Sequence, residues 1–206
     1  MPLDLVKFDA NQRYVQGIGL PGTPVPVLDH GFVRLVDYMG RDEAIVQGAR
    51  VSYGKGTKTV REDNSLISYL HSNRHTSPFE MVEVKFHVRL PIFVARQWIR
   101  HRTGSFNEAS ARYSIMTDDF YVPDVEKITG QDMKNRQART AEEISDPASA
   151  RELIEGHNFA SYERYKKLIE LGVARELARI VLPVNIYTEW YWKTDLHNLL
   201  HFISLR

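Results

Sequence analysis

The residues from Met81 to Leu90, MVEVKFHVRL, decide the fold class, because apolar and polar side chains alternate along this stretch. The even positions from Val82 to Leu90 are all apolar, and the odd positions from Glu83 to Arg89 are charged or histidine. Successive side chains of an extended chain point to opposite faces, so one face would be apolar and the other polar. The stretch therefore predicts a β-strand with one face in the core.

The same alternation recurs between Val184 and Lys193, near the other end of the chain. Ile186, Trp190 and Trp192 share one face there, and polar or tyrosine residues occupy the opposite face. Large aromatic side chains are usually well buried. We therefore expect Trp190, Tyr191 and Trp192 to lie in the core or at a subunit contact, and not to stack on a cofactor.

Helical periodicity occupies much of the chain around these two strands. A short strand is predicted to begin at Phe32, and residues 118–137 show little periodicity of either kind. The predicted helices cover 42–51, the segment around 66–70 that ends near 73, 91–99, 138–171 apart from an interruption at 146–147, and 175–182. Strands and helices mixed in this way, without an internal repeat or a linker, predict a single mixed α/β domain.

Residues 1–29 differ in composition from the remainder, because they hold four of the nine prolines and show no clear period. We expect them to form an extended N-terminal arm, and residues 30–206 to form the domain that carries the function. Residues 53–60 combine two glycines with lysines and threonines, which is the composition of a mobile loop.

Composition narrows the class of protein. The 206 residues are 43% hydrophobic and 26% charged, which suits one domain with a buried core. A net charge of +1 argues against a general nucleic-acid binder, whose affinity needs basic residues massed on one face. We find no secretory leader and no apolar stretch of membrane-spanning length. We therefore expect a cytoplasmic protein without a membrane or nucleic-acid partner.

The chain contains no cysteine, which excludes disulfides, thiolate metal sites and a cysteine nucleophile. Its histidines lack the spacing of a metal site, since His71 and His75 are a lone pair one helical turn apart. Neither a dinucleotide-binding fingerprint nor the phosphate-binding loop of an NTPase occurs. Metal binding is therefore not expected.

A different kind of site is indicated between Arg100 and Arg112, RHRTGSFNEASAR. The triplet Arg100–Arg102 follows a predicted helix and offers cationic groups for a phosphate, which arginine can bind through two parallel hydrogen bonds. Asn107, Glu108 and Ser110 can pair with the donors and acceptors of a base. The plainer alternative is a solvated helix end whose arginines pair with carbonyls and nearby carboxylates. The combination favours a nucleotide as ligand.

The same string matches, at every defining position, the pattern R-H-R-x-x-S-x-N-E-x-S-x-R, and the chain thereby resembles the flavin-dependent thymidylate synthases (thymidylate synthase complementing proteins). Further blocks look like family blocks in the family order: Ala49–Ser52, His75–Glu80, Ala178–Pro183 and His201–Arg206. The resemblance runs from about His30 to the last residue.

The resemblance implies a single α+β domain whose central, largely antiparallel sheet is flanked by helices. It also implies reductive methylation of dUMP to dTMP, with 5,10-methylenetetrahydrofolate as one-carbon donor and FAD, reduced by NADPH, as hydride source. Such a reaction needs no cysteine nucleophile, which agrees with the composition. The family resemblance further implies a homotetramer with active sites shared between subunits. Both routes for the methylene group, by way of the flavin or directly to the pyrimidine, fit the sequence.

Residue roles are carried over from the family position by position. The residues expected to hold dUMP are Gln97, Arg100, Glu108, Ser110, Ala111, Arg112, Arg179 and Arg206. Those expected to contact FAD are Ser52, Ser77, Arg100, His101, Arg102, Asn107, Glu108, Asp195, His197 and His201. His75 and Tyr113 are expected near the face used by folate and nicotinamide.

Arg206 and Ser110 are the candidates for catalysis. A cation at position 206 would stabilise negative charge as hydride reaches the uracil ring. Ser110 would act by hydrogen bonding, because the sequence places no base beside it to make it a nucleophile.

Several alternatives stay open at the level of sequence. Asp195 would equally serve as the N-cap of the last helix, and the histidines that follow it would equally pack in a core. The family's frequent Asn and Arg stand here as Asp195 and His197, and the chain stops at Arg206, where relatives usually continue with a further helical segment. A flavin oxidoreductase acting on another nucleotide fits the same motif. So does a single-stranded RNA-binding module with Phe106 and Tyr113 as stacking groups.

Overall fold

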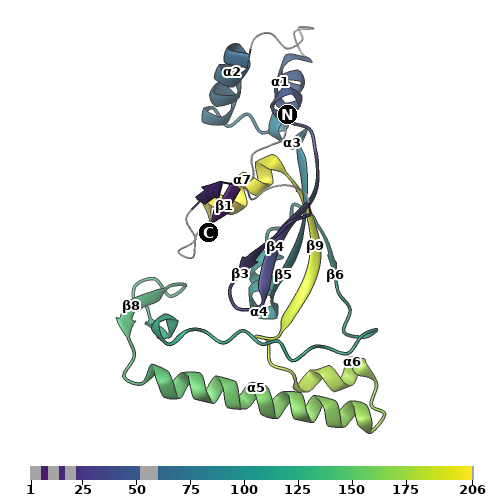
Figure 1. Cartoon of the computed structure of the whole chain (residues 1–206). Coiled ribbons are helices and arrows are strands. Elements are labelled where there is room, and N and C mark those ends of the chain that lie inside the picture. Colours follow the sequence, from purple (N-terminus) through teal and green to yellow (C-terminus); the bar gives the residue numbers. More distant parts are fainter. Residues whose placement is uncertain (1–5, 9–13, 17–21, 52–59, 206) are drawn as a thin grey trace.

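The computed structural model describes residues 6–8, 14–16, 22–51 and 60–205. Its centre is a five-stranded sheet in the order β3-β4-β5-β9-β6, in which every pairing is antiparallel. These strands are Pro24–Val27 (β3), Gly31–Met39 (β4), Glu83–Pro91 (β5), Ser105–Glu108 (β6) and Tyr187–Asp195 (β9). The predicted α+β fold with a largely antiparallel sheet is confirmed (Figure 1).

Helices lie at both ends of this sheet and beside it (Figure 1). They are Asp42–Arg50 (α1), Val60–Ser72 (α2), Ser77–Glu80 (α3), Ile92–Trp98 (α4), Pro147–Glu170 (α5), Arg175–Ala178 (α6) and Leu196–Ser204 (α7), with 3-10 turns at Val125–Lys127 (η2) and Arg179–Val181 (η3). The helix predicted over 175–182 is thus present as α6 followed by η3.

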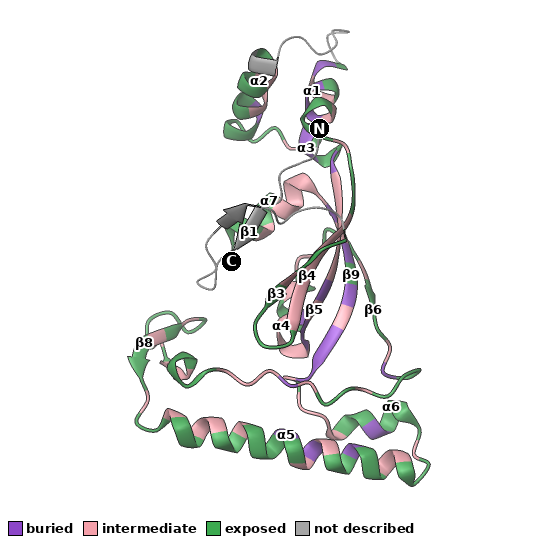
Figure 2. Ribbon diagram, in the orientation of Figure 1, coloured by how far each residue is buried: buried purple, intermediate pink, exposed green. Residues whose placement is uncertain are grey.

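The two alternating stretches lie side by side in the middle of the sheet. Val88 of β5 is opposite Trp190 of β9, and Phe86 is opposite Trp192, so the apolar positions of both strands share one face. Val88, Trp190 and Trp192 are each at most 2% exposed and form the main core with side chains of α4 and α7. Both strands are therefore oriented as predicted, and burial of this face stabilises the sheet. Much of β9 is coloured as buried in Figure 2.

The opposite face of the sheet is polar. His87 lies flat against Tyr191, with ring centroids 4.7 Å apart, and its Nε2 atom is 3.1 Å from Oε2 of Glu189. Such cross-strand pairs stabilise the register of neighbouring strands. In the aromatic run, Trp190 and Trp192 are core residues as expected, whereas Tyr191 is 42% exposed.

A second, smaller core joins α1, α2 and α3 at one end of the sheet (Figure 1). Ile45, Leu70 and Phe79 are buried in it, together with Val82 at the start of the central strand. Leu196 of α7 packs against the same cluster. Since α7 also packs on the main core, it ties the two clusters together.

The expected N-terminal arm is described in parts. Two short strands, Val6–Phe8 (β1) and Tyr14–Gln16 (β2), pair with each other, and β3 pairs with β4 at the edge of the main sheet. Residues 24–27 are therefore part of the sheet, and the boundary at residue 29 stays a prediction. The predicted loop at 53–60 lies, up to residue 59, outside the described residues, and Val60 begins α2.

One predicted element is wrong in part. The helix expected over 138–171 begins only at Pro147, and the strand β8 (residues 139–143) stands in place of its first turns. That strand pairs with β7 (Thr129–Gln131), and Nε2 of Gln131 donates a 2.9 Å hydrogen bond to the carbonyl of Ala138 across the turn. Alanine and glutamate favour helix locally, but these contacts across the hairpin override that preference.

Candidate active site

A cavity of about 920 Å³ opens beside the end of the sheet where β9 begins. Its walls come from α4, from β9, from the α6–η3 turn and from residues 109–116, the segment that follows β6. Its charged and hydrogen-bonding lining residues are Arg96, Glu108, Ser110, Arg112, Glu176, Arg179 and Thr188. This volume and this mixture of apolar walls with a few polar groups are typical of a small-molecule site.

The charges in the cavity favour an anionic ligand. The lining residues include three arginines, from α4, the segment after β6 and η3, but only two glutamates. Arginine binds phosphate oxygens through paired hydrogen bonds. The cavity therefore suits a phosphate ester that also presents hydrogen-bonding groups.

Strand β6 and strand β9 together orient Glu108. Glu108 ends β6, where it lies opposite Trp190. Oγ1 of Thr188 donates a 2.7 Å hydrogen bond to Oε1 of Glu108, and Thr188 is only 6% exposed. Within the described part of the chain, the second carboxylate oxygen, Oε2, receives no hydrogen bond. One oxygen is thus fixed by the sheet, and the other can accept from a ligand.

The segment after β6 forms a tight turn at the cavity. The backbone N–H of Ala109 donates to the carbonyl of Glu189 at 2.8 Å, which holds the segment against β9. Oγ of Ser110 accepts from the backbone N–H of Arg112 at 3.3 Å and from its Nε at 3.4 Å. The hydroxyl and the guanidinium are therefore neighbours in the cavity wall.

The α6–η3 turn supplies the facing arginine. Nε of Arg179 lies 3.4 Å from the carbonyl oxygen of Glu176, to which it donates, and the intervening Ala178 is fully buried. Nη1 of Arg175 donates to the carbonyl of Tyr113 at 2.5 Å. This contact joins the α6 wall to the wall that follows β6.

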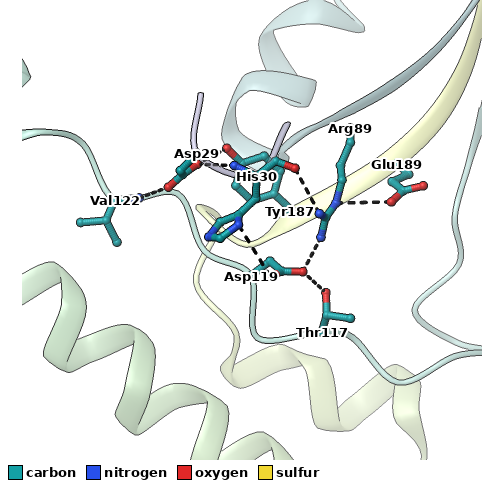
Figure 3. A network of polar contacts seen from close by, with 8 residues as sticks. All are labelled: Asp29, His30, Arg89, Thr117, Asp119, Val122, Tyr187 and Glu189. Carbon is teal, nitrogen blue, oxygen red and sulfur yellow. Dashed lines mark hydrogen bonds and ion pairs between the residues drawn. The ribbon is translucent and has the colours of Figure 1, made fainter. Parts of the chain in front are cut away.

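A network of polar contacts stiffens the same end of the sheet (Figure 3). Arg89 pairs with Asp119 through Nη2, lies 3.3 Å from Oε1 of Glu189 through Nε, and donates to the carbonyl of His30 at 3.1 Å. Thr117 donates a 2.8 Å hydrogen bond to Asp119. Burial raises the pKa of Asp119, but hydrogen bonds from Thr117 and Arg89 and the charges of Arg89 and His30 outweigh it, so this pKa lies below its ordinary value.

Asp29 forms the other half of this network. Its carboxylate accepts from the hydroxyl of Tyr187 at 2.5 Å and from the backbone N–H of Val122 at 3.3 Å. Burial, and then the hydrogen bond to Asp29, raises the pKa of Tyr187 well above its ordinary value, so the phenol stays a neutral donor. Met116 lines the cavity and lies six residues before Val122 in the chain. Its backbone N–H donates to the hydroxyl of Tyr165 at 3.1 Å.

Comparison with known protein families identifies the family of the chain that forms this cavity. The family model described as "Thymidylate synthase complementing protein" matches residues 34–206, which include every lining residue of the cavity. The chain belongs to this family.

Relatives in this family are similar over most of the chain. The flavin-dependent thymidylate synthase of Thermus thermophilus is 60% identical over 182 residues, which make up 88% of this chain and 66% of the relative. That of Wolbachia pipientis wMel is 57% identical over 183 residues, or 87% of this chain and 64% of the relative. The chain thus spans slightly less than two thirds of the length of these relatives.

Solved structures share the fold. The UMP/dUMP methylase PolB from Streptomyces cacaoi, bound with 5-Br UMP, has a TM-score of 0.77 and 38% identity, with 87% of this chain and 77% of that chain covered. The same methylase bound with 5-Br dUMP has a TM-score of 0.77 and 36% identity, with 87% and 80% covered. This likeness agrees with the α+β fold that resemblance to thymidylate synthase complementing proteins implied.

Most residues that the family pattern assigns to dUMP meet in one place. Those lining the cavity are Glu108, Ser110, Ala111, Arg112 and Arg179. Gln97 and Arg100 do not line it: both are exposed at the end of α4, whose cavity-facing residues are Ile92, Ala95, Arg96 and Ile99. Arg206 lies outside the described residues.

Several residues that the family pattern assigns to FAD lie at the opposite end of β9, whereas Glu108, assigned to both ligands, lines the cavity. Asp195 ends this strand and caps α7, because its Oδ1 accepts a 2.9 Å hydrogen bond from the N–H of Asn198. The alternative role as an N-cap is therefore confirmed. His197 and His201 follow on α7, and neither is fully buried.

Other members of this set lie close to α7. The ring of His101 is 4.9 Å from that of Phe202 on α7, so the basic triplet Arg100–Arg102 adjoins this helix. Ser77 begins α3, which packs against α7. Asn107 lies between the two ends, paired with Tyr191 across β6 and β9. Ser52 lies outside the described residues.

The two residues assigned to folate and nicotinamide are not together within one chain. His75 follows α2, and its ring is 6.0 Å from that of Tyr69. Tyr113 lies near α6, 74% exposed, with the guanidinium carbon of Arg112 5.3 Å from its ring centroid. The structure therefore separates them along the length of the sheet (Figure 1).

Three of the charged and hydrogen-bonding cavity residues, Arg96, Glu176 and Thr188, were absent from the sequence-based assignment. Arg96 had a readable signal, since it is four residues after Ile92 and three before Ile99 and so shares their face of a helix. Thr188 alternates with Ile186 and Trp190, so the sequence predicts a core position for it. The hydrogen bond from its hydroxyl to Glu108 could not be predicted from the sequence. No sequence pattern predicted a cavity position for Glu176, because the residues around α6 do not indicate that this helix borders the cavity.

The described ranges also bear on two other kinds of site, a membrane span and a bound metal ion. No helix there is both long and apolar enough to cross a membrane. No group of three or more histidine, aspartate and glutamate side chains there is arranged to hold a metal ion.

Proposed function

We propose that this chain is the catalytic part of a flavin-dependent thymidylate synthase, which methylates dUMP reductively to dTMP. The observation that carries the proposal is the cavity, in which Glu108, Ser110, Arg112 and Arg179 meet. The relatives of that name and the nucleotide-bound methylase of the same fold support it. Residues 30–206 form the catalytic domain in this proposal.

The cavity residues have complementary roles toward dUMP. Arg112 and Arg179 bind the phosphate and the pyrimidine oxygens, because each presents several N–H donors and a permanent charge. Glu108 accepts from the base through the oxygen that Thr188 leaves unpaired. Ser110 donates a hydrogen bond and is not a nucleophile. The cation of Arg206 stabilises negative charge that develops on the uracil ring.

The end of the sheet at α7 fits a flavin nucleotide. The triplet Arg100–Arg102 supplies cationic donors for a diphosphate, and the contact of His101 with Phe202 sets this triplet against α7. Neutral, acidic and imidazole groups are added there by Ser77, Asp195, His197 and His201, and Asn107 lies beside the middle of β9. Bound FAD, reduced by NADPH, supplies the hydride of the reaction, and 5,10-methylenetetrahydrofolate supplies the carbon. His75 and Tyr113 border the face for folate and nicotinamide.

The active site is shared between subunits of a homotetramer in this proposal. The cavity and the α7 end lie at opposite ends of β9, and a strand of nine residues spans about 27 Å. Gln97 and Arg100 are exposed and lie outside the cavity of their own chain. A neighbouring subunit would bring these two residues, with their flavin, to the cavity.

The deciding experiment is turnover of the FAD-loaded protein with NADPH, 5,10-methylenetetrahydrofolate and dUMP. We expect dTMP as product, and we expect UMP or dCMP to be converted far more slowly. UMP is the informative competitor, since the solved relative is a UMP/dUMP methylase. A flavoprotein that oxidises NADPH but converts none of these nucleotides would contradict the proposal.

A variant separates the two halves of the reaction. Arg206→Ala should abolish dTMP formation while largely sparing flavin reduction by NADPH, because its charge acts on the uracil ring. Equal loss of both half-reactions would refute the catalytic role of Arg206.

Sharing of the site can be tested by mixing two variants. Arg100→Ala and Arg112→Ala should each be inactive alone, and subunit exchange between them should restore part of the activity, because some sites then combine two intact halves. Recovery would support a shared site. Absence of recovery, with mixed tetramers verified by mass, would exclude it.

A further inference from the structure

Arg96 occupies a position that the family pattern leaves without a role. Helix α4 turns Ile92, Ala95, Arg96 and Ile99 toward the cavity. These positions follow the spacing of one helical face. Arg96 is the charged member of this otherwise apolar stripe, and its side chain is exposed. A helix that needed only to pack would place an apolar residue at this position, or turn the arginine toward open solvent.

The other two cavity arginines are already held within the chain. Nε and Nη2 of Arg112 lie 3.4 and 3.5 Å from the hydroxyls of Ser110 and Tyr113. Arg179 donates through Nε to a backbone carbonyl. Within residues 22–51 and 62–205, by contrast, no hydrogen bond or ion pair engages the guanidinium of Arg96. Its planar set of donors is therefore complete and available to a ligand.

The ligand that suits such a group is an oxyanion. A guanidinium has five N–H donors and no acceptor, so it pairs best with a charged group that only accepts. Phosphate is the part of a nucleoside monophosphate with that character. The base edge is better served by Glu108 and Ser110, which offer an acceptor and a hydroxyl.

We propose that Arg96 binds the phosphate of the nucleotide and thereby sets the preference of the site for a nucleoside monophosphate over the nucleoside. The inference rests on the proposed function and adds a residue to it. Arg96 acts in this role as a substrate-binding residue, together with the arginines that the family pattern already assigns to the cavity.

The test measures binding of dUMP and of deoxyuridine to the FAD-loaded protein. The variants are Arg96→Ala and Arg96→Gln, which keeps most of the side-chain length without the charge. Loss of a charge-assisted hydrogen bond to phosphate should raise the dissociation constant of dUMP about 10- to 100-fold in both variants. The dissociation constant of deoxyuridine should change by less than about twofold, because that ligand has no phosphate.

Arg164→Ala is the matched control, since Arg164 is an exposed arginine on α5 that does not line the cavity. It should leave both dissociation constants unchanged. Equal weakening of dUMP and deoxyuridine by both Arg96 variants would show a general effect on the cavity and overturn the inference. Unchanged dUMP binding would overturn it as well. If wild-type protein binds dUMP and forms dTMP in either case, the proposed function stands and only the role of Arg96 falls. Wild-type protein that fails to bind dUMP refutes both.

Discussion

The hydroxyl of Thr188 lies 2.7 Å from Oε1 of Glu108 and couples the buried face of β9 to the cavity. Thr188 shares its face of the strand with Trp190, which is 1% exposed. The aromatic core thus fixes the threonine, and the threonine fixes one oxygen of the carboxylate. A carboxylate oriented before the ligand arrives loses little freedom on binding, which favours the bound geometry.

Replacing this threonine should impair the cavity without unfolding the sheet. Thr188→Val keeps the shape of the side chain but removes the hydrogen bond to a charged group, so kcat/KM for dUMP should fall about 10- to 100-fold. The matched control is Thr194→Val on the same strand, where a hydroxyl of a 3% exposed threonine donates to the carbonyl of Thr103. That variant should keep kcat/KM within about twofold. Equal losses in the two variants, measured by steady-state kinetics, would contradict the coupling.

Ser110 should contribute hydrogen bonds and no covalent chemistry. Ser110→Ala should raise KM for dUMP by roughly fivefold, which corresponds to one neutral hydrogen bond of about 1 kcal/mol. Removal of a true nucleophile would lower kcat by about a millionfold. Ser114→Ala is the control, because among the described residues the Ser114 hydroxyl donates only to the carbonyl of Ser110, at 3.4 Å. A covalent adduct with dUMP, detected by intact mass in wild type and missing in Ser110→Ala, would reverse this assignment.

Arg89 should stabilise the fold through the network at the end of the sheet. Arg89→Ala removes the guanidinium that pairs with both Asp119 and Glu189, so the free energy of unfolding should fall by about 1–3 kcal/mol. The side chain of Arg89 is only 21% exposed, whereas Lys127 and Asp124 form an exposed pair. Lys127→Ala should therefore leave unfolding unchanged. Urea denaturation measures both, and similar losses in the two variants would argue against a special role for the network.

The pH dependence of stability should reveal the carboxyl of Asp119. Its pKa in the folded protein lies below the ordinary value of 3.8. A group of this kind contributes stability that is present above 3.8 and is lost as the pH falls through the folded value. Asp119→Asn should thus lower the free energy of unfolding at neutral pH and reduce its fall in acid. Parallel curves of stability against pH for wild type and variant would rule out this contribution.

The apolar and polar faces of the two central strands were the most predictable part of the fold. The alternation from Val82 to Leu90 places Val88 opposite Trp190 on one face, as the structure has it. A period of two residues is a local property, so it survives in the sequence without knowledge of partners. The segment 139–143 shows the opposite case, because its helical composition gave way to a hairpin contact with residues 129–131. Local preference is worth only tenths of a kcal/mol per residue there, and pairing outweighs it.

The type of ligand could be predicted from the residue types in the motif, whereas the positions of these residues in space could not. The string from Arg100 to Arg112 pointed to a nucleotide because phosphate and base require those side chains. Only folding separated Arg100, exposed beyond α4, from Arg112 in the cavity, although they are close in the motif. Folding also brought Arg96 and Arg179, which are far apart in the sequence, to the lining of one cavity. Contacts between residues far apart in the chain depend on strand order and helix packing, and these follow from burial of the whole core and not from any single stretch.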